Sequence, residues 1–300
     1  MIQIEKSLPD VRQDLANFSI ITLVSASAPQ LGDTRGPMTF KRPRPKGPQQ
    51  RKFDRPQWQK PDDDGPVLLF GIHAIEAALR NPDRTVSKLY LTENAERRLS
   101  EALTARGVQA ERVIPRDLDR RLGADTVHQG ALLETEPLPE VSLEDLAHRG
   151  DAGPILVLDQ VTDPHNVGAV LRSAAAFGAA GLVMTRRNSP PLTGTLAKSA
   201  SGALDLVPIA LVQNLARALA DLGGLGVVRI GLEGSADNSL EAEPLTGALA
   251  IVLGAEGKGL RQLTQEHCDR LCRILTPGPL ASLNVSNAAA VALHLCAMRR

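Results

Sequence analysis

The sequence contains few aromatic residues and few cysteines. Its 300 residues include one Trp, one Tyr, five Phe and three Cys. Three cysteines without a C-x-x-C pair cannot form a complete disulfide framework, so we expect reduced thiols and a cytoplasmic protein. His267 next to Cys268 has no further ligands at the spacing of a zinc site, so we expect no metal.

Long apolar runs are missing as well. No stretch approaches the length that spans a bilayer, and the N-terminus lacks a charged start followed by an apolar core and a cleavage site. We therefore expect a soluble protein with no membrane partner. Residues 1–37 contain no recognisable structural unit, and Met38 is an alternative start of the native chain.

The formal net charge is zero, but the charges are unevenly distributed. Residues 35–60 contain nine Lys or Arg and one acid, so this segment carries +8 and the remainder carries −8. The segment is also rich in proline and glutamine, which predicts a disordered basic arm over residues 1–64. Two roles remain open for this arm: attraction of nucleic acid, with Phe40, Phe53 and Trp58 stacking on bases, or simple solubilisation.

Two series of alternating strands and helices follow, and they predict an α/β protein with two domains, 65–140 and 154–300, joined by a linker at 141–153. The apolar runs ILVL and AIVL are typical of strands in the middle of a parallel sheet that is covered on both faces. In the first domain we expect strands at 87–94, 108–114 and 130–137 and helices at 71–81, 95–107 and 115–123. In the second we expect strands at 155–161, 181–187, 227–232, 248–254 and 270–275, and helices at 166–178, 211–223 and 284–300.

Three glycine-rich or polar segments, 158–178, 253–260 and 274–287, each follow a predicted strand. Because ligands bind beyond the carboxyl ends of parallel strands, these segments can converge on one ligand. The middle one, LGAEGKGL, is not a P-loop, because Val252 and Gly259 stand where that motif needs a glycine and a Ser or Thr. Nor does any G-x-G-x-x-G follow a strand, so a dinucleotide fold has little support.

Helix capping explains some of these polar residues. Asp163 or Asn166 can cap the helix near 166, and Ser286 or Asn287 can cap the last helix. Capping does not explain Arg172, six residues after Asn166. On sequence alone, Arg172 is either a solvated arginine or a functional one.

The three segments resemble the three motifs of the SpoU/TrmH family of RNA ribose 2′-O-methyltransferases. They match N-x-G-x-x-x-R at 166–172, G-x-E-x-x-G at 254–259 and S-L-N-V-S-x-A at 282–288. In addition, GIHAIEAAL at 71–79 and HQGALLE at 128–134 resemble the L30e-like RNA-binding domain that precedes the catalytic domain in bacterial ribosomal-RNA members.

The resemblance implies a C-terminal α/β trefoil-knot (SPOUT) methyltransferase domain, a small L30e-like α/β domain and S-adenosylmethionine as cofactor. The implied reaction is 2′-O-ribose methylation of ribosomal RNA, with a guanosine of 23S rRNA as the expected target. The implied cofactor-binding residues, acting largely through backbone, are Gly254, Ile274 and Leu283. The implied catalytic residues are Asn166, Arg172, Glu256, Ser282 and Asn284.

The same resemblance implies a homodimer, which the apolar residues Val291, Leu293 and Leu295 of the last helix could support. The chain departs from the family at Leu275 and Thr276, where Pro-Met is usual, and at Asn287, where an apolar residue is common. These changes affect the expected pocket wall and remove no expected catalytic residue.

Two other functions stay open at this point. The first is 2′-O-methylation of transfer RNA, which the N-terminal RNA-binding domain argues against. The second is a non-catalytic RNA-binding factor in ribosome assembly, although such a factor would have no need for the complete catalytic set. The role of Arg172 is also open between general base and electrostatic stabiliser, and a guanidinium that stays protonated favours the second.

Overall fold

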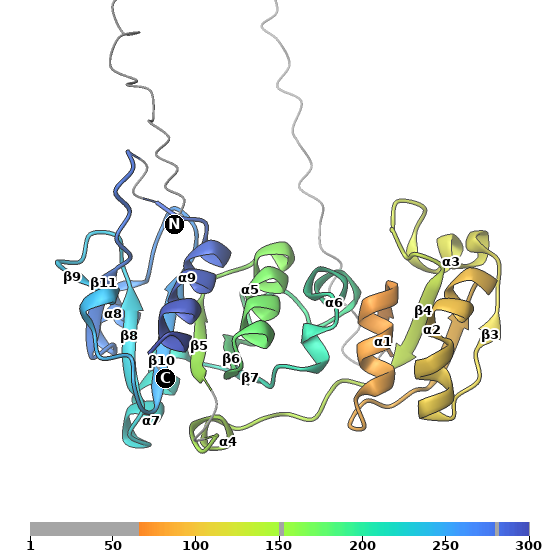
Figure 1. Cartoon of the computed structure of the whole chain (residues 1–300), viewed down its shortest axis with the longest axis horizontal. Coiled ribbons are helices and arrows are strands. Elements are labelled where there is room, and N and C mark those ends of the chain that lie inside the picture. Colours follow the sequence, from red (N-terminus) through yellow and green to blue (C-terminus); the bar gives the residue numbers. More distant parts are fainter. Residues whose placement is uncertain (1–65, 150–152, 280–281, 300) are drawn as a thin grey trace, which may run out of the picture. The chain divides into compact units, whose positions relative to one another are not determined.

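The computed structural model describes residues 66–149, 153–279 and 282–299, all of them in one compact unit, Lys60–Arg300. The basic arm expected over residues 1–64, with Phe40, Phe53 and Trp58, lies outside the described residues. The described chain forms two sheets with helices packed against them (Figure 1). Because strands and helices alternate along the chain, the α/β fold class is confirmed.

The first sheet has four strands in the order β1-β4-β2-β3. β4 is antiparallel to both β1 and β2, and β2 is parallel to β3. The strands are β1 (Val67–Phe70), β2 (Lys88–Leu91), β3 (Glu111–Arg112) and β4 (Ala131–Thr135), and the helices are α1 (Ile72–Arg80), α2 (Glu93–Arg106) and α3 (Pro115–Leu122).

Side chains of the first sheet alternate between two apolar layers, because successive residues of a strand point to opposite faces. In β2, Leu89 and Leu91 share a core cluster with α1 and α2, whereas Tyr90 packs with Leu118 of α3. Thr92, expected within a strand at 87–94, instead starts α2 by accepting a hydrogen bond from the Ala95 amide. The helices therefore cover both faces of the small sheet.

The second sheet has seven strands in the order β7-β6-β5-β10-β8-β11-β9, and every neighbouring pair is parallel. Its central strands β5 and β10 hold the apolar runs that the sequence places in the middle of a parallel sheet, so this prediction is confirmed. The strands are β5 (Gly153–Asp159), β6 (Ala179–Thr185), β7 (Ile209–Val212), β8 (Val228–Leu232), β9 (Asn238–Ser239), β10 (Leu249–Gly254) and β11 (Arg270–Arg273). The helices are α4 (Leu143–Ala147), α5 (Pro164–Ala176), α6 (Gly194–Ala200), α7 (Leu215–Gly224), α8 (Gln262–Glu266) and α9 (Val285–Ala297), with short 3₁₀ turns η1 (Ala203–Asp205) and η2 (Leu240–Ala242).

Apolar clusters cover both faces of this sheet. Leu156 and Leu158 of β5 share one cluster with α5 and α9, and Ile155 and Val157 share another with α7. Figure 1 shows α5 and α9 running beside β5, and α7 near the foot of the sheet. Since β5 is buried throughout, its carboxyl end brings the following loop directly to the edge of a rigid core.

Several elements differ from the sequence expectation. Residues 211–223 were expected as one helix, but 209–212 form β7, which pairs with β6, and α7 begins only at Leu215. Pairing with a buried neighbouring strand overrides the local helical pattern there. The strand expected at 108–114 is reduced to the two residues of β3, and the segment expected as a linker contains α4, whose Leu146 is buried.

The sequence assigned three apolar residues of the last helix to a dimer contact, and this assignment is wrong for Leu293. Leu293 is fully buried and belongs to the core cluster of the second sheet, whereas Val291 is exposed and Leu295 is partly buried. Residues two positions apart on a helix lie on different sides, so Leu293 cannot share an exposed face with the other two. Among the described helices, the structure contains none that is long and apolar enough to span a membrane.

Candidate active site

The two asparagines and the glutamate of the sequence motifs meet beyond the carboxyl ends of β5 and β10. The side-chain amide of Asn284, just before α9, donates to Asn166 Oδ1 at 3.0 Å and to Glu256 Oε2 at 3.3 Å. These residues come from three segments far apart in the sequence, so the convergence expected from the parallel sheet is observed for them.

Asn284 is also the N-cap of α9. Its Oδ1 accepts from the Ser286 backbone N–H at 2.9 Å and from the Ser286 hydroxyl at 2.6 Å. The expectation that Ser286 or Asn287 caps this helix is therefore wrong, because an asparagine two residues earlier reaches the free N–H. Since capping uses the oxygen, the amide nitrogen is directed toward Asn166 and Glu256.

Asn166 is free for this contact because another residue caps α5. Asp163 accepts from the His165 N–H at 2.9 Å, and Pro164 occupies the first helical position. A proline is tolerated there because its missing N–H would have no partner within the helix. Of the two caps that the sequence allowed, the structure selects Asp163.

A buried carboxylate fastens the loop that carries Glu256. Asp159, at the end of β5, is fully buried and accepts from the Arg261 N–H at 3.1 Å, the Arg261 Nε at 2.8 Å and the Thr264 hydroxyl at 2.7 Å. The loop leaves the sheet at the end of β10 and is then bonded to the end of the neighbouring strand β5, where Asp159 pairs with Gly254. Sequence reasoning missed Asp159, although a carboxylate at the end of an apolar strand is a usable signal.

Glycine is required where this loop folds back on itself. A Cβ on Gly254 would overlap the backbone carbonyl of Gly259, and Gly259 adopts φ +64°. The G-x-E-x-x-G spacing therefore reflects a tight loop that presents Glu256 and backbone amides to one side.

A cavity of about 410 Å³ lies beside this loop. All three expected cofactor-binding residues, Gly254, Ile274 and Leu283, line it, together with Glu256 and Ser282. Its size falls within the usual range of small-molecule sites, about 300–1,000 Å³. Thr276, expected at the pocket wall, lines it too, and the lining residues that sequence reasoning missed include Glu233, Lys258 and Arg273.

Cys272 lines the same cavity but is not set up as a nucleophile. Its thiol is buried, and burial raises its pKa to about 11. Because only the thiolate is a strong nucleophile, the site does not favour covalent cysteine chemistry at neutral pH.

Arg172 is not joined to the Asn166–Glu256–Asn284 cluster. It is exposed on α5, its guanidinium makes no hydrogen bond or ion pair with another residue in the described part of the chain, and it does not line the cavity. Six residues of α-helix turn the side chain by roughly 240° from Asn166. The structure therefore brings together Asn166, Glu256 and Asn284, with Ser282 at the cavity, and leaves Arg172 free to meet a ligand.

Comparisons with known proteins fit these motifs and this geometry. Residues 153–294 match the model of the SpoU rRNA Methylase family, and residues 68–141 match the model described as RNA 2′-O ribose methyltransferase substrate binding. The 23S rRNA (guanosine-2′-O-)-methyltransferase RlmB of Pseudomonas putida is 39% identical over 240 residues, covering 77% of this chain and 96% of that protein. The chain belongs to the SpoU rRNA methylase family.

Other relatives agree with this membership. The RlmB protein of Vibrio cholerae is 41% identical over 241 residues, and the alignment covers 78% of this chain and 97% of the Vibrio protein. The SpoU methyltransferase AviRb of Streptomyces viridochromogenes, solved with AdoMet, is 23% identical and aligns with a TM-score of 0.66 over 79% of this chain and 91% of that one. An AdoMet-bound rRNA methyltransferase of Sinorhizobium meliloti is 19% identical, with a TM-score of 0.65 over 77% of this chain and 86% of that one. At these identities the two solved structures show a common fold.

The residues of the cavity fit S-adenosylmethionine chemically. Apolar side chains such as Leu253, Ile274 and Val285 can pack on an adenine ring, and backbone groups of the glycine loop can form hydrogen bonds with it. The Glu233 carboxylate can accept from hydroxyl or ammonium groups, and the Arg273 guanidinium suits a carboxylate. The donor set therefore matches the mixed apolar, cationic and anionic character of this cofactor.

Proposed function

We propose that the chain is an S-adenosylmethionine-dependent methyltransferase that modifies the ribose 2′-hydroxyl of a guanosine in 23S ribosomal RNA. The proposal rests on one observation above all: Asn284 bonds to Asn166 and to Glu256, and Glu256 lines the cavity that Gly254, Ile274 and Leu283 also line. Curated relatives that are named for this activity align with the chain over nearly their whole length, which supports the same substrate for this chain.

The proposed chemistry needs alignment more than a strong catalyst group. Bound S-adenosylmethionine supplies a methyl group on a sulfonium, which is already activated for transfer. The chain must place the 2′-hydroxyl in line with that methyl and stabilise the negative charge that develops on the oxygen as its proton leaves. In this proposal, Asn166, Asn284 and Ser282 hold the hydroxyl.

Glu256 is our candidate for receiving the proton. It is the carboxylate within the asparagine cluster, and one of its oxygens accepts from Asn284 at 3.3 Å, which leaves the other oxygen for the substrate. Arg172 is then assigned to the RNA phosphate and to the developing charge, because a guanidinium stays protonated in proteins. Gly254, Ile274 and Leu283 are assigned to the cofactor, largely through backbone contacts.

The domain organisation remains part of the proposal. We assign residues 1–64 to a basic arm, 65–140 to an L30e-like substrate-binding domain, 141–153 to a linker and 154–300 to the methyltransferase domain. The match of residues 68–141 to a substrate-binding model supports the second assignment. We propose the trefoil knot from the resemblance of residues 166–172, 254–259 and 282–288 to the SpoU/TrmH motifs.

A homodimer formed through the methyltransferase domain and a cytoplasmic location complete the proposal. Size-exclusion chromatography with light scattering tests the dimer directly, because dimer and monomer differ twofold in mass. A monomer at the concentration that supports methyl transfer would contradict it.

Methyl transfer from radiolabelled S-adenosylmethionine tests the proposed function. The substrates are 23S rRNA, 16S rRNA and transfer RNA purified from a strain that lacks the gene, with 2′-O-methylation mapped in each. We expect label in one ribose of 23S rRNA, appearing at least about 100-fold more slowly with the Asn284→Asp variant. Label in transfer RNA alone would favour the tRNA alternative, and binding of RNA without label would favour the assembly factor.

A further inference from the structure

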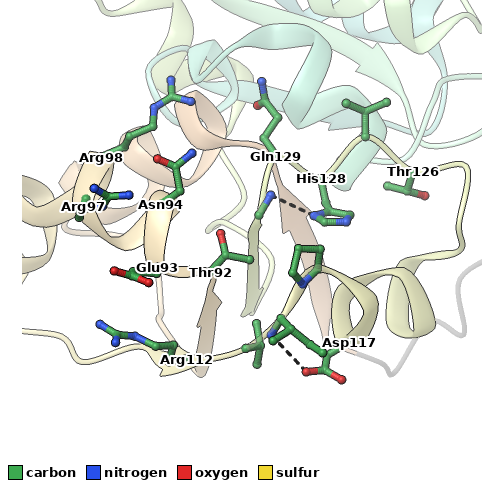
Figure 2. A pocket seen from close by; sticks show the side chains of 15 residues that line it. Thr92, Glu93, Asn94, Arg97, Arg98, Arg112, Asp117, Thr126, His128 and Gln129 are labelled. Atoms are coloured by element: carbon green, nitrogen blue, oxygen red, sulfur yellow. Dashed lines mark hydrogen bonds between the residues drawn. The ribbon is translucent and has the colours of Figure 1, made fainter.

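A second hollow, of about 1030 Å³, lies on the small domain that contains the four-stranded sheet (Figure 2). None of its lining residues lines the cofactor cavity. The start of α2, the β3–α3 corner and the loop before β4 form its walls. Its lining residues are Thr92, Glu93, Asn94, Arg97, Arg98, Arg112, Val113, Ile114, Pro115, Asp117 and residues 126–130.

Two arginines of the hollow have unused guanidinium groups. Arg97 and Arg98 are exposed on α2 and make no hydrogen bond or ion pair with any residue that the structure describes. Figure 2 shows both beside Asn94 on the α2 wall. Their charges are therefore available to an anionic ligand.

Arg112 and Asp117 of the hollow have partners, whereas the exposed Glu93 forms no hydrogen bond or ion pair with a residue that the structure describes. Arg112 donates from Nε and Nη2 to Glu96 at 3.0 and 2.7 Å, and the nearby Glu93 further raises the pKa of this arginine. Asp117 accepts from the Ile114 N–H at 3.2 Å and also pairs with Arg120. The unpaired positive charges of the hollow are thus those of Arg97 and Arg98, against one unpaired negative charge at Glu93.

The hollow also exposes apolar surface. Ile114 is 59% exposed and Val127 is 62% exposed, and both line it. They are the two exposed large apolar side chains that the structure records in the described small domain. A single exposed aliphatic residue needs no explanation, but two of them facing one hollow beside two free arginines favour a ligand that is anionic on one side and apolar on the other.

The loop that carries Val127 is held in place. Nδ1 of His128 accepts from the Gly130 N–H at 3.0 Å, so the ring holds its proton on Nε2, 3.1 Å from Asp119 Oδ1. A Cβ on Gly130 would overlap the Thr92 side chain, so this position requires glycine.

Gln129 is fixed in an uncommon conformation within this loop. Its φ is +57°, and its Oε1 accepts from the Ile72 N–H at 3.1 Å. Because the oxygen is used, the amide NH₂ stays available as a donor. Non-glycine residues in this region of φ are strained and cluster at ligand sites, which is a second reason to infer a binding role.

We propose that this hollow binds an unpaired nucleotide of the RNA substrate, with phosphates on Arg97 and Arg98 and the base against Ile114 and Val127. This inference rests on the proposed function and adds the part of the RNA that the small domain recognises. A duplex suits the hollow less well, because its bases are stacked inside and cannot reach an apolar surface. Gln129 then donates to an edge of the base.

Two sets of variants of the full chain separate the two halves of the inference. The probes are a ten-nucleotide single-stranded RNA and a duplex of about the same length, and their affinity is measured across a range of salt concentrations. We expect Arg97→Glu/Arg98→Glu to weaken single-strand binding at least tenfold. The slope of log K against log salt concentration should also become shallower by about 1.4, because each phosphate contact of a single strand contributes about 0.7 to that slope. Ile114→Ala/Val127→Ala should weaken binding about tenfold with an unchanged slope, because it removes apolar contact only.

Arg217→Glu is the control, because it reverses the charge of one arginine just as each hollow substitution does. Arg217 is exposed on α7 and does not line the hollow. It should leave single-strand binding within twofold of the parent chain. With 23S rRNA as substrate, the hollow variants should raise KM and leave kcat and the cofactor Kd unchanged.

Three results would overturn the inference: unchanged single-strand affinity in both variant sets, an equal loss of duplex binding, or an equal loss in Arg217→Glu. Failure of the proposed function is distinguishable from these outcomes. A chain that transfers no methyl group to any RNA, yet loses single-strand binding in the hollow variants, would refute the activity and leave the nucleotide site standing.

Discussion

The amide nitrogen of Asn284 lies 3.0 Å from Oδ1 of Asn166, a residue 118 positions earlier in the chain. The same asparagine caps α9 through its oxygen, so one side chain both starts a helix and joins two sequence motifs. A carboxylate could perform the first task but not the second, because it has no hydrogen to donate.

The first prediction uses this division of tasks. Asn284→Asp keeps an oxygen for the Ser286 N–H but removes the donors to Asn166 and Glu256 and places two carboxylates together. We expect kcat to fall by about 100-fold or more, the usual cost of a lost donor at a reacting oxygen. Asn284→Ala should lose the cap as well and cost about 1 kcal/mol of stability. Methyl-transfer kinetics and urea unfolding measure the two effects, and an active Asn284→Asp variant would contradict the role given to the amide.

The second prediction concerns the loop that Asp159 fastens. Asp159→Asn retains the shape but weakens the charge-assisted bonds from Arg261 and Thr264, at a cost of about 1.5–3 kcal/mol. Because this loop borders the cofactor cavity, affinity for S-adenosylmethionine should fall with stability. Thr264→Val removes one of the three bonds and should cost about 1 kcal/mol. Calorimetry and denaturant unfolding test both, and full cofactor affinity in Asp159→Asn would show that the loop needs no such anchor.

The third prediction concerns a buried ion pair. Arg84 Nε lies 2.8 Å from Asp205 Oδ1, and the two side chains are 2% and 1% exposed. Asn81 also donates to Asp205, at 3.1 Å. Removing one partner of such a pair leaves a buried charge, so Arg84→Met or Asp205→Leu should each destabilise the chain by about 3–5 kcal/mol.

The double variant provides the control for this pair. Arg84→Met/Asp205→Leu leaves no buried charge and should therefore be less destabilised than the sum of the single variants. Urea unfolding of all four chains measures the coupling. Additive losses would mean that the pair contributes no more than two separate side chains do.

The fourth prediction is a pH dependence. The hydrogen bonds from Arg229 hold the pKa of Asp269 below its usual range. A depressed folded pKa stabilises the fold above the unfolded value, about 3.9, and this contribution is lost as the pH falls through the folded pKa. The stability difference between the parent chain and Asp269→Asn should therefore be largest above pH 4 and shrink in acid. Unfolding of both chains followed from pH 2 to 7 measures this difference, and a difference that stays constant into acid would contradict the prediction.

Local patterns predicted the central strands and the polar loops, because burial and turn chemistry are both visible along the sequence. They failed where a distant partner decides the outcome. Residues 209–212 became a strand only because β6 offers an edge, and Leu293 turned inward because α9 packs on the sheet. The positions of three loops after predicted strands indicated a common location, and the family resemblance selected Asn166, Glu256 and Asn284 within them, but the contact between these side chains depends on three-dimensional folding. The local sequence marks Asp159 as a carboxylate at the end of an apolar strand, but it does not show that Arg261 and Thr264 return to it.

The last prediction addresses Arg172, which the structure leaves outside the asparagine cluster and outside the cofactor cavity. In the role proposed for it, Arg172 meets the RNA phosphate and the developing charge, so Arg172→Ala should lower methyl transfer by about 100-fold or more. The cofactor Kd in calorimetry should stay within twofold of the parent, since the side chain does not line the cavity. Arg217→Ala, another exposed arginine, controls for loss of charge alone.

Arg172→Lys distinguishes the two roles considered for this residue. As an electrostatic stabiliser, lysine should restore part of the rate with an unchanged pH profile, because its charge persists at neutral pH. As a general base, lysine with its ordinary pKa of about 10.4 should shift the pH profile of kcat to lower pH than arginine gives. Lost cofactor affinity in Arg172→Ala, or full activity in that variant, would remove Arg172 from the catalytic assignment altogether.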